Sequence, residues 1–148
     1  MRESCRVIVI KNNQLVVMYR EKNGKAYYVF PGGGKDEGET LVECAKREAL
    51  EEFGIEVSPT KKVYEYSDSG TLQHFFVADW IGGELGGGQG EEFEEGQTKG
   101  VYIPMLIDIS KLADYNILPA EVKQVLVKDL EVYGVELGDS VQVIKGIF

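Results

Sequence analysis

The segment from Thr40 to Gly54 constrains this 148-residue chain more than any other part of it, because it carries the signals that begin and end a helix. Thr40, followed three residues later by Glu43, forms a capping box. The residues from 41 to 53 contain neither Gly nor Pro, and Gly54 stands where a left-handed residue commonly ends a helix. The sequence therefore predicts a helix over 40–53.

This helix has an apolar stripe with acidic residues beside it. The stripe consists of Val42, Ala45, Ala49 and Phe53. Glu48, Glu51 and Glu52 share an arc of about 100° that flanks the stripe. Carboxylates this close raise one another's pKa unless a partner compensates them, and hard oxygen donors at this spacing suit Mg²⁺ or Mn²⁺. The residues alone therefore leave two interpretations open, a metal site and a solvated acidic face.

The residues around the helix carry a specific resemblance. Gly33, Glu39 and the run from Arg47 to Ile55 match the pattern G-x5-E-x7-R-E-U-x-E-E-x-G-U, in which U is a bulky apolar residue. Ala49 is smaller than the residue usual at the first U. The chain thus resembles the Nudix hydrolase superfamily, MutT-like enzymes with this box, here over 33–55.

The resemblance implies a fold and a set of site residues. The fold is α/β, an α/β/α sandwich around a mixed β-sheet, which we expect to form one domain over residues 1–148. Glu48, Glu51 and Glu52 look like the metal carboxylates, and Gly32 or Gly33 would add a backbone carbonyl. Arg47 and Glu39 look like supporting residues, with Arg47 clamping a neighbouring carboxylate. Glu48 or Glu52 is also a candidate for the general base.

The rest of the chain predicts strands around this helix and one further helix. The expected strands are 6–10 and 14–20 (a hairpin), 26–30, 63–67, 72–80, 101–103 (ended by Pro104) and 141–144, and the further helix is 120–133. This order favours a mixed sheet packed against helices.

Other residues that could do chemistry have plainer alternatives. Cys5 and Cys44 are expected to be reduced, small apolar residues. We expect His74, the only histidine, to be packed or hydrogen-bonded rather than catalytic. The aromatic residues of the strands could stack on a nucleobase but are more typical of a core; they are Tyr27, Tyr28, Phe75, Phe76 and Trp80.

A glycine-rich segment from 82 to 100 holds a second group of acids. The family often adds one more acid from a loop outside the box, as metal ligand or base, and the candidates are Glu91, Glu92, Glu94 and Glu95. Nothing in the sequence chooses among them, and solvated side chains are the alternative for each.

Charge and hydropathy exclude several functions. The net charge of −9 argues against a nucleic-acid polymer as partner, because phosphate backbones need a basic face. No apolar run approaches the roughly 20 residues of a membrane span, and the first residues lack the apolar stretch of a signal peptide. We therefore expect a cytoplasmic protein without a membrane partner.

The function expected from the resemblance is hydrolysis, dependent on Mg²⁺ or alternatively Mn²⁺, of a diphosphate bond in a small molecule. That molecule would be a nucleoside diphosphate linked to another moiety, such as a nucleoside triphosphate, an oxidised nucleotide or a nucleotide sugar. One alternative is a Nudix-fold sensor or interaction module that binds a nucleotide without turnover. Another is an acidic protein-binding domain without metal. The sequence does not choose the substrate, and a homodimer is left open.

Overall fold

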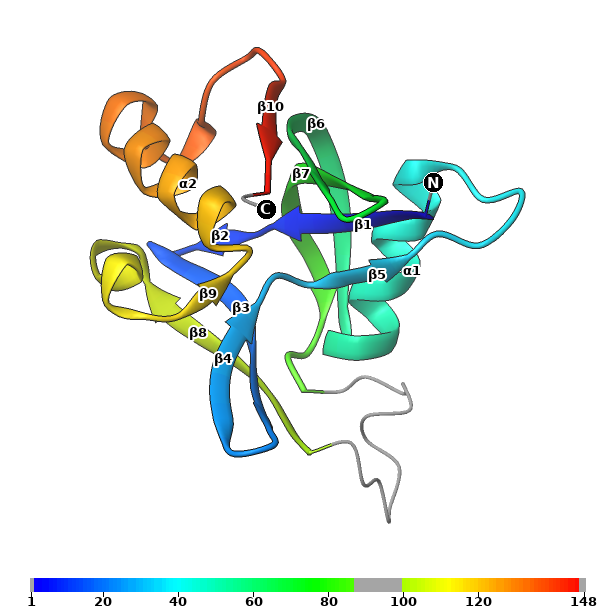
Figure 1. Ribbon diagram of the computed structural model, residues 1–148, viewed down its shortest axis with the longest axis horizontal. Coiled ribbons are helices and arrows are strands. Elements are labelled where there is room, and N and C mark those ends of the chain that lie inside the picture. The colour runs from blue at the N-terminus through cyan, green and yellow to red at the C-terminus, as the bar shows by residue number, and fades with distance from the viewer. Residues whose placement is uncertain (1, 87–99, 147–148) are drawn as a thin grey trace.

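The computed structural model describes residues 2–86 and 100–146 as two five-stranded sheets with helices packed against them (Figure 1). The first sheet has the order β10-β6-β7-β1-β5, and the second has β2-β3-β4-β9 with β8 beside β3. The strands are β1 (Arg2–Ile8), β2 (Ile10–Lys11), β3 (Gln14–Lys22), β4 (Lys25–Val29), β5 (Gly32–Gly34), β6 (Ile55–Asp68), β7 (Thr71–Gly83), β8 (Val101–Asp108), β9 (Ile117–Leu118) and β10 (Gln142–Lys145). The helices are α1 (Leu41–Phe53) and α2 (Ala120–Tyr133), with the 3₁₀ helices η2 (Ile109–Asp114) and η3 (Gly134–Glu136).

The first sheet is mixed, as predicted. The strands β6 and β7 form a long antiparallel hairpin, whereas β1 runs parallel to β7 and β10 parallel to β6. The short strand β5 closes one edge, antiparallel to β1. The α/β class is therefore confirmed, although the strands are divided between two sheets rather than gathered in one.

Helix α1 begins and ends where the sequence predicts. The Thr40 hydroxyl accepts from the Glu43 backbone N–H, and the Glu43 side chain accepts from the Thr40 N–H. Gly54 ends the helix with a φ of 78°, a left-handed conformation that glycine adopts without a steric cost. The helix packs against β1, β5 and β6.

The buried face of α1 differs from the predicted stripe at three positions, one of which is Cys44, fully buried although it was not in the stripe. Ala45, Ala49 and Phe53 are fully buried as expected, but Val42 is 43% exposed. Glu48, predicted to flank the stripe, is only 8% exposed and lies within the buried face. The side chain fits there because the neighbouring strand β5 consists of three glycines.

Helix α2 lies on the other side of the sheets from α1 (Figure 1). Its residues Val122 and Leu126 are buried in one cluster with Phe30 and Phe75, whose rings meet edge to face at 5.3 Å. The predicted bounds 120–133 are confirmed, with Pro119 before the helix and Gly134 after it.

Several strand predictions were too short. Pro104 does not end its strand: β8 runs to Asp108, and it pairs only with β3 among the described strands, an edge position in which proline is tolerated. The strand β6 begins at Ile55, eight residues before the predicted start at 63. The sequence pattern did not show this first part, because register shifts such as that between Pro59 and Lys61 interrupt the alternation of its side chains. The turn at Asn12 and Asn13, which have φ values of 53° and 62°, confirms a hairpin at this place, but only Ile10 and Lys11 of its first strand pair with β3. Residues 6–8 of the predicted strand 6–10 belong to β1, which pairs with β5 and β7 in the first sheet.

Neither described α-helix is long and apolar enough to span a membrane.

Candidate functional site

Arg47 of α1 is the centre of the ion pairs around the predicted box. Its Nε donates to Glu39 Oε2 at 2.6 Å and its Nη2 to Glu39 Oε1 at 3.0 Å, so the pair is bidentate. Its Nη1 donates to Glu48 Oε1 at 2.9 Å and to Glu51 Oε2 at 3.2 Å. One guanidinium therefore fixes three carboxylates of the box.

These contacts shift the pKa values of Glu39 and Arg47, which we call the clamp. Hydrogen bonds from Arg47, together with the backbone N–H of Asp36, lower the pKa of Glu39 from 4.5 to about 2. The hydrogen bond to Glu39 in turn raises the pKa of Arg47, and Glu48 adds to that shift. Glu39 and Arg47 thus stay charged over the pH range of ordinary biochemistry.

The glycine strand β5 gives the Glu48 carboxylate its place. A Cβ at Gly33 would lie 2.5 Å from Glu48 Oε2, which is closer than side chains tolerate. A Cβ at Gly32 would lie 2.0 Å from the Cys5 carbonyl oxygen and 2.8 Å from Arg6 Cδ, and its φ is 149°. Position 32 therefore requires glycine, whereas a side chain at position 33 would have to displace the Glu48 carboxylate.

A cavity of about 400 Å³ opens over this strand. We call it the carboxylate cavity; the side chains of Arg2, Ser4, Arg6, Glu48, Glu52, Thr71 and Gln73 line it together with the three glycines of β5. The structure thus brings Glu48 and Glu52 to one cavity beside Gly32 and Gly33. Glu51 is not in this lining; its side chain is 51% exposed and contacts Arg47.

The donors of the cavity suit a hard divalent cation. In the part of the chain that the structure describes, no three His, Cys, Asp or Glu side chains are grouped closely enough to hold a metal ion. Two carboxylates and the glycine backbone nevertheless supply oxygen donors only, which Mg²⁺ and Mn²⁺ prefer. The Gly32 and Gly33 carbonyls accept from Arg6 and Cys44, and a carbonyl oxygen has a second lone pair for a further contact. The site therefore fits such an ion.

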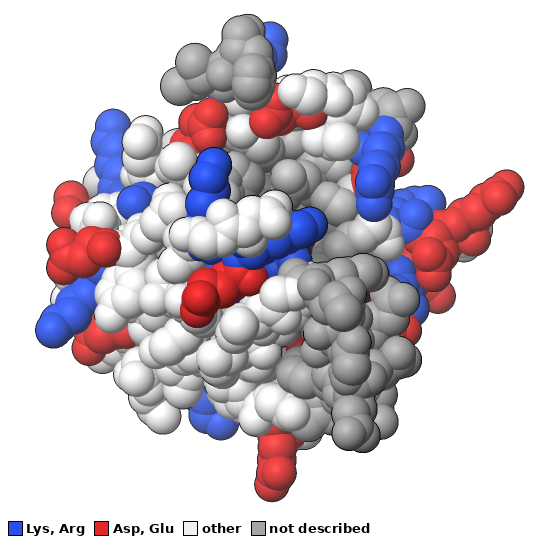
Figure 2. Space-filling view, turned by 60° about the horizontal axis from the view of Figure 1, so that its bottom comes forward, with Lys and Arg blue, Asp and Glu red and all other residues white. Residues whose placement is uncertain are grey.

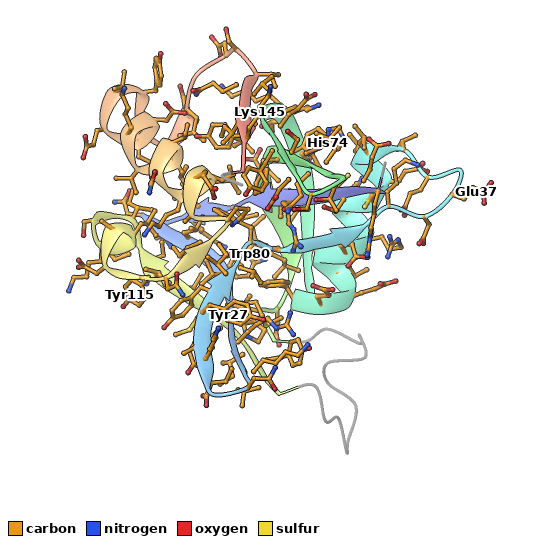
Figure 3. The ribbon with its side chains drawn as sticks, in the orientation of Figure 1. Tyr27, Glu37, His74, Trp80, Tyr115 and Lys145 are labelled. Carbon is orange, nitrogen blue, oxygen red and sulfur yellow. The ribbon has the colours of Figure 1, made fainter. Side chains whose placement is uncertain are left out.

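Among the other candidates from the sequence, His74, Cys5 and Cys44 are not in the lining of this cavity. His74 on β7 is buried with its Nε2 2.7 Å from Glu3 Oε2, in agreement with the predicted packed histidine (Figure 3). Cys5 and Cys44 are buried without a disulfide, as predicted, and burial raises the pKa of both thiols. Glu91, Glu92, Glu94 and Glu95 lie outside the described residues.

The aromatic candidates divide into core and surface positions. Phe75 is fully buried and Phe76 nearly so, as expected of core residues. Tyr27 projects from β4 near Arg20, whose guanidinium lies 5.7 Å from its ring centroid (Figure 3). The Arg20 guanidinium also lies 4.1 Å from the ring centroid of Tyr102.

Sequence reasoning missed five side chains of the carboxylate cavity, those of Arg2, Ser4, Arg6, Thr71 and Gln73. The signal that could have found Arg6 is its charge inside the otherwise apolar run from Cys5 to Ile10. Gln73 carries no comparable signal, because polar residues are ordinary at the start of a strand.

On the face that Figure 2 displays, the described charged side chains do not form a large patch of one sign. Figure 2 shows that basic and acidic side chains are interspersed over the described part of the face that it displays. Such a face is not the continuous basic surface typical of proteins that bind nucleic-acid backbones.

Comparisons with solved structures place this fold. The structure superposes on a NUDIX hydrolase from Nitrosomonas europaea with a TM-score of 0.75 at 17% identity, covering 98% of this chain and 79% of that one. At this identity the likeness shows the fold alone, an α/β fold of the NUDIX hydrolase kind.

Sequence comparisons identify the family. The NUDIX domain model matches residues 1–105, and the chain therefore belongs to the NUDIX domain family, which confirms the resemblance seen in the box. The ADP-ribose pyrophosphatase of Methanocaldococcus jannaschii is 35% identical over 88 residues, which are 55% of this chain and 52% of that protein. The putative 8-oxo-dGTP diphosphatase of Bacillus subtilis is 34% identical over 80 residues, 53% of each chain. The chain thus spans about half the length of these curated relatives.

Proposed function

We propose that this chain is a divalent-metal-dependent pyrophosphohydrolase acting on a nucleoside diphosphate linked to another moiety. The observation that carries the proposal is the convergence of Glu48 and Glu52 on one cavity beside the glycines of β5. Two relatives support it by their names, one being an ADP-ribose pyrophosphatase and the other a putative 8-oxo-dGTP diphosphatase. Both names describe hydrolysis of a diphosphate bond in a small nucleotide derivative.

The ion, Mg²⁺ or alternatively Mn²⁺, would be held by Glu48, Glu51 and Glu52 with a carbonyl of Gly32 or Gly33. When bound, such an ion neutralises charge on the diphosphate oxygens and lowers the pKa of a bound water. Glu51 contacts Arg47 in the structure, so its share in binding requires its half-exposed side chain to turn towards Glu48 and Glu52.

The chain's own residues have separate tasks in this reaction. Glu48 or Glu52 accepts a proton from the water that attacks phosphorus. Arg47 holds the Glu48 carboxylate through Nη1 while Glu39 fixes the guanidinium from the other side, so both act as positioning residues. Water adds across the P–O–P bond, and the products are a nucleoside monophosphate and the phosphorylated remainder.

The test is a screen for release of phosphate or nucleoside monophosphate with Mg²⁺, with Mn²⁺ and with excess chelator. The panel contains 8-oxo-dGTP, ADP-ribose, a dinucleoside polyphosphate and a sugar nucleotide. We expect turnover of at least one compound, lost in chelator and rising from neutral to mildly alkaline pH, because the carboxylates and the attacking water must lose protons. Binding without turnover would favour the sensor alternative, and undiminished turnover in chelator would contradict the metal dependence.

A further inference from the structure

A second cavity adjoins the carboxylate cavity and has a different chemistry. It measures about 380 Å³ and lies between the end of β6, the start of β7 and the start of α2. Tyr66, Glu121 and Leu118 line it, and we call it the Tyr66 cavity. Arg6 and Gln73 line both cavities, so these two side chains mark the junction.

Arg6 is anchored in a way that leaves part of its guanidinium unused. Its Nη1 donates to the Phe30 carbonyl at 3.0 Å and to the Gly32 carbonyl at 3.1 Å. These are the hydrogen bonds that Arg6 makes to described residues, and they leave Nε and Nη2 without a partner there. Because a guanidinium carries five N–H donors in a planar fork, three remain for a ligand. The anchoring also removes much of the conformational freedom that an arginine otherwise loses on binding.

The charges near Arg6 are those expected at a phosphate site that also contains carboxylates. Burial lowers the pKa of Arg6, whereas the negative charges of Glu52 and Glu48 act in the opposite direction. A half-buried cation facing two acids can bind the anionic part of a ligand beside the carboxylates that would hold a metal ion.

Gln73 supplies a second observation that points to a ligand. Its Oε1 is buried and has no hydrogen-bond partner among the described residues. Buried acceptors are rarely left unpaired in native proteins, and an unmade hydrogen bond at such an atom costs about 1–3 kcal/mol. Because Oε1 is covered by protein atoms, a ligand with a hydroxyl or amine donor would satisfy it only if the Gln73 side chain turns towards the junction.

The walls of the Tyr66 cavity disfavour a further phosphate. The Tyr66 hydroxyl lies 3.3 Å from both Asp68 Oδ2 and Glu121 Oε1. Burial raises the pKa of Tyr66 to about 12, so the phenol stays neutral between these two acids. Two carboxylates repel an anion but accept hydrogen bonds from hydroxyl and amine groups.

We propose that Arg6 binds the diphosphate of the substrate at the junction of the two cavities. The phosphates then reach Glu48 and Glu52 in the carboxylate cavity, while a neutral moiety that carries hydroxyl or amine groups, such as a nucleoside, occupies the Tyr66 cavity. This inference rests on the proposed function for its substrate class, but it concerns binding and is testable without turnover.

The test measures the affinity of two probes by calorimetry in the presence of Mg²⁺: inorganic pyrophosphate and α,β-methylene-ADP, whose bridging carbon resists hydrolysis. In Arg6→Gln we expect both affinities to fall at least about tenfold, the effect of losing a charge-assisted contact. Circular dichroism checks that this variant is folded, because the shorter glutamine side chain loses the contacts of Nη1 with Phe30 and Gly32. Lys128→Gln is the control: it removes one positive charge from an exposed position on α2 that lines neither cavity, and we expect a change of less than about threefold.

A further variant tests the division between the cavities. Ala120→Trp places a large side chain in the lining of the Tyr66 cavity. We expect it to weaken α,β-methylene-ADP at least about tenfold and to leave inorganic pyrophosphate unchanged. Equal effects on the two probes would contradict the placement of the neutral moiety.

The outcomes separate this inference from the proposed function. Three results would each overturn the inference even if the enzyme turns over a substrate. They are unchanged affinities in Arg6→Gln, equal losses in Lys128→Gln and Arg6→Gln, and no binding of either probe by the wild type. If circular dichroism shows that Arg6→Gln is unfolded, Arg6→Lys is measured instead, because lysine keeps the positive charge and lacks the planar N–H donors of a guanidinium. An unchanged affinity of this variant for pyrophosphate overturns the inference, and a loss of threefold or more supports it. Absence of turnover with intact, Arg6-dependent binding would contradict only the proposed function.

Discussion

The Glu48 carboxylate occupies the space that a side chain at position 33 would need. A Cβ at Gly33 would lie 2.5 Å from Oε2 and 2.8 Å from Oε1 of Glu48. The acid can therefore lie within the buried face of α1 only because the strand beside it has no side chains at this point. The glycines of the box are part of the geometry of its carboxylates.

This relationship predicts the effect of Gly33→Ala. The added methyl group displaces the Glu48 carboxylate, and we expect turnover to fall at least about 100-fold, because a displacement of about 1 Å at a catalytic group has that effect. The unfolding free energy is expected to change by less than about 1.5 kcal/mol, since the clash is with the end of one side chain. Gly34→Ala is the control: the nearest atom to its Cβ is Arg2 Nη2 at 3.6 Å, an ordinary contact. Equal activity of the two variants would contradict the proposal that the absence of a side chain at position 33 positions the Glu48 carboxylate for turnover.

Glu52→Gln tests the proposed metal site. We expect turnover to fall at least about 100-fold while the protein stays folded, because one charge is lost from the ligand set. The free energy of unfolding of the metal-free protein is expected to be unchanged or higher, because like charges along α1 are relieved. The measurement pairs kinetics over a Mg²⁺ titration with thermal unfolding, and Glu131→Gln on the exposed face of α2 serves as control. Activity within threefold of the wild type would show that turnover does not need the Glu52 carboxylate.

Local signals predicted the helices well and the site partly. The caps at Thr40 and Gly54 act over a few residues, so both ends of α1 follow from the sequence. The burial of Glu48 does not, because it depends on the glycines of β5 reaching its side chain from elsewhere in the chain. The same limit applies to Arg6, whose contacts with Phe30 and Gly32 span more than twenty residues.

The sheets show the same division between local and distant causes. The hairpin turn at Asn12 and Asn13 is encoded by the two residues themselves, which adopt positive φ readily. The full length of β6 is not encoded in its own residues in this way, because register shifts against β7 let its side chains depart from strict alternation. Pairing with another strand, rather than propensity, decides where such a strand begins.

Tyr64→Phe tests how α2 and β10 are attached to the first sheet. The fully buried Tyr64 hydroxyl donates to Asp129 Oδ2 at 2.7 Å, and Gln142 Nε2 donates to the same oxygen at 2.7 Å. Loss of the hydroxyl leaves a buried carboxylate with one donor fewer, which costs about 1–3 kcal/mol, or roughly 2–4 °C in Tm for each kcal/mol. Tyr133→Phe is the control, since Tyr133 is 56% exposed. A Tm unchanged in both variants would mean that the Asp129 contact contributes nothing net.

The clamp between Glu39 and Arg47 predicts a pH dependence of stability. The pKa of Glu39 in the folded protein is about 2, below its ordinary value of 4.5, so the unfolded chain binds the proton more tightly. The stabilisation from Glu39 is therefore fully present above about pH 4.5 and is lost as the pH falls towards 2. The Glu39→Gln variant lacks this contribution, so its unfolding free energy is expected to lie below that of the wild type at pH 7. The difference between the two proteins is expected to shrink as the pH falls from about 4.5 towards 2. Denaturant titrations at pH 7, 4 and 2.5 measure it, with Glu37→Gln as control, because Glu37 points away from the molecule and pairs with no described residue (Figure 3). A deficit that stays constant from pH 7 to 2.5 would show that the Glu39 carboxylate contributes no charge-dependent stability.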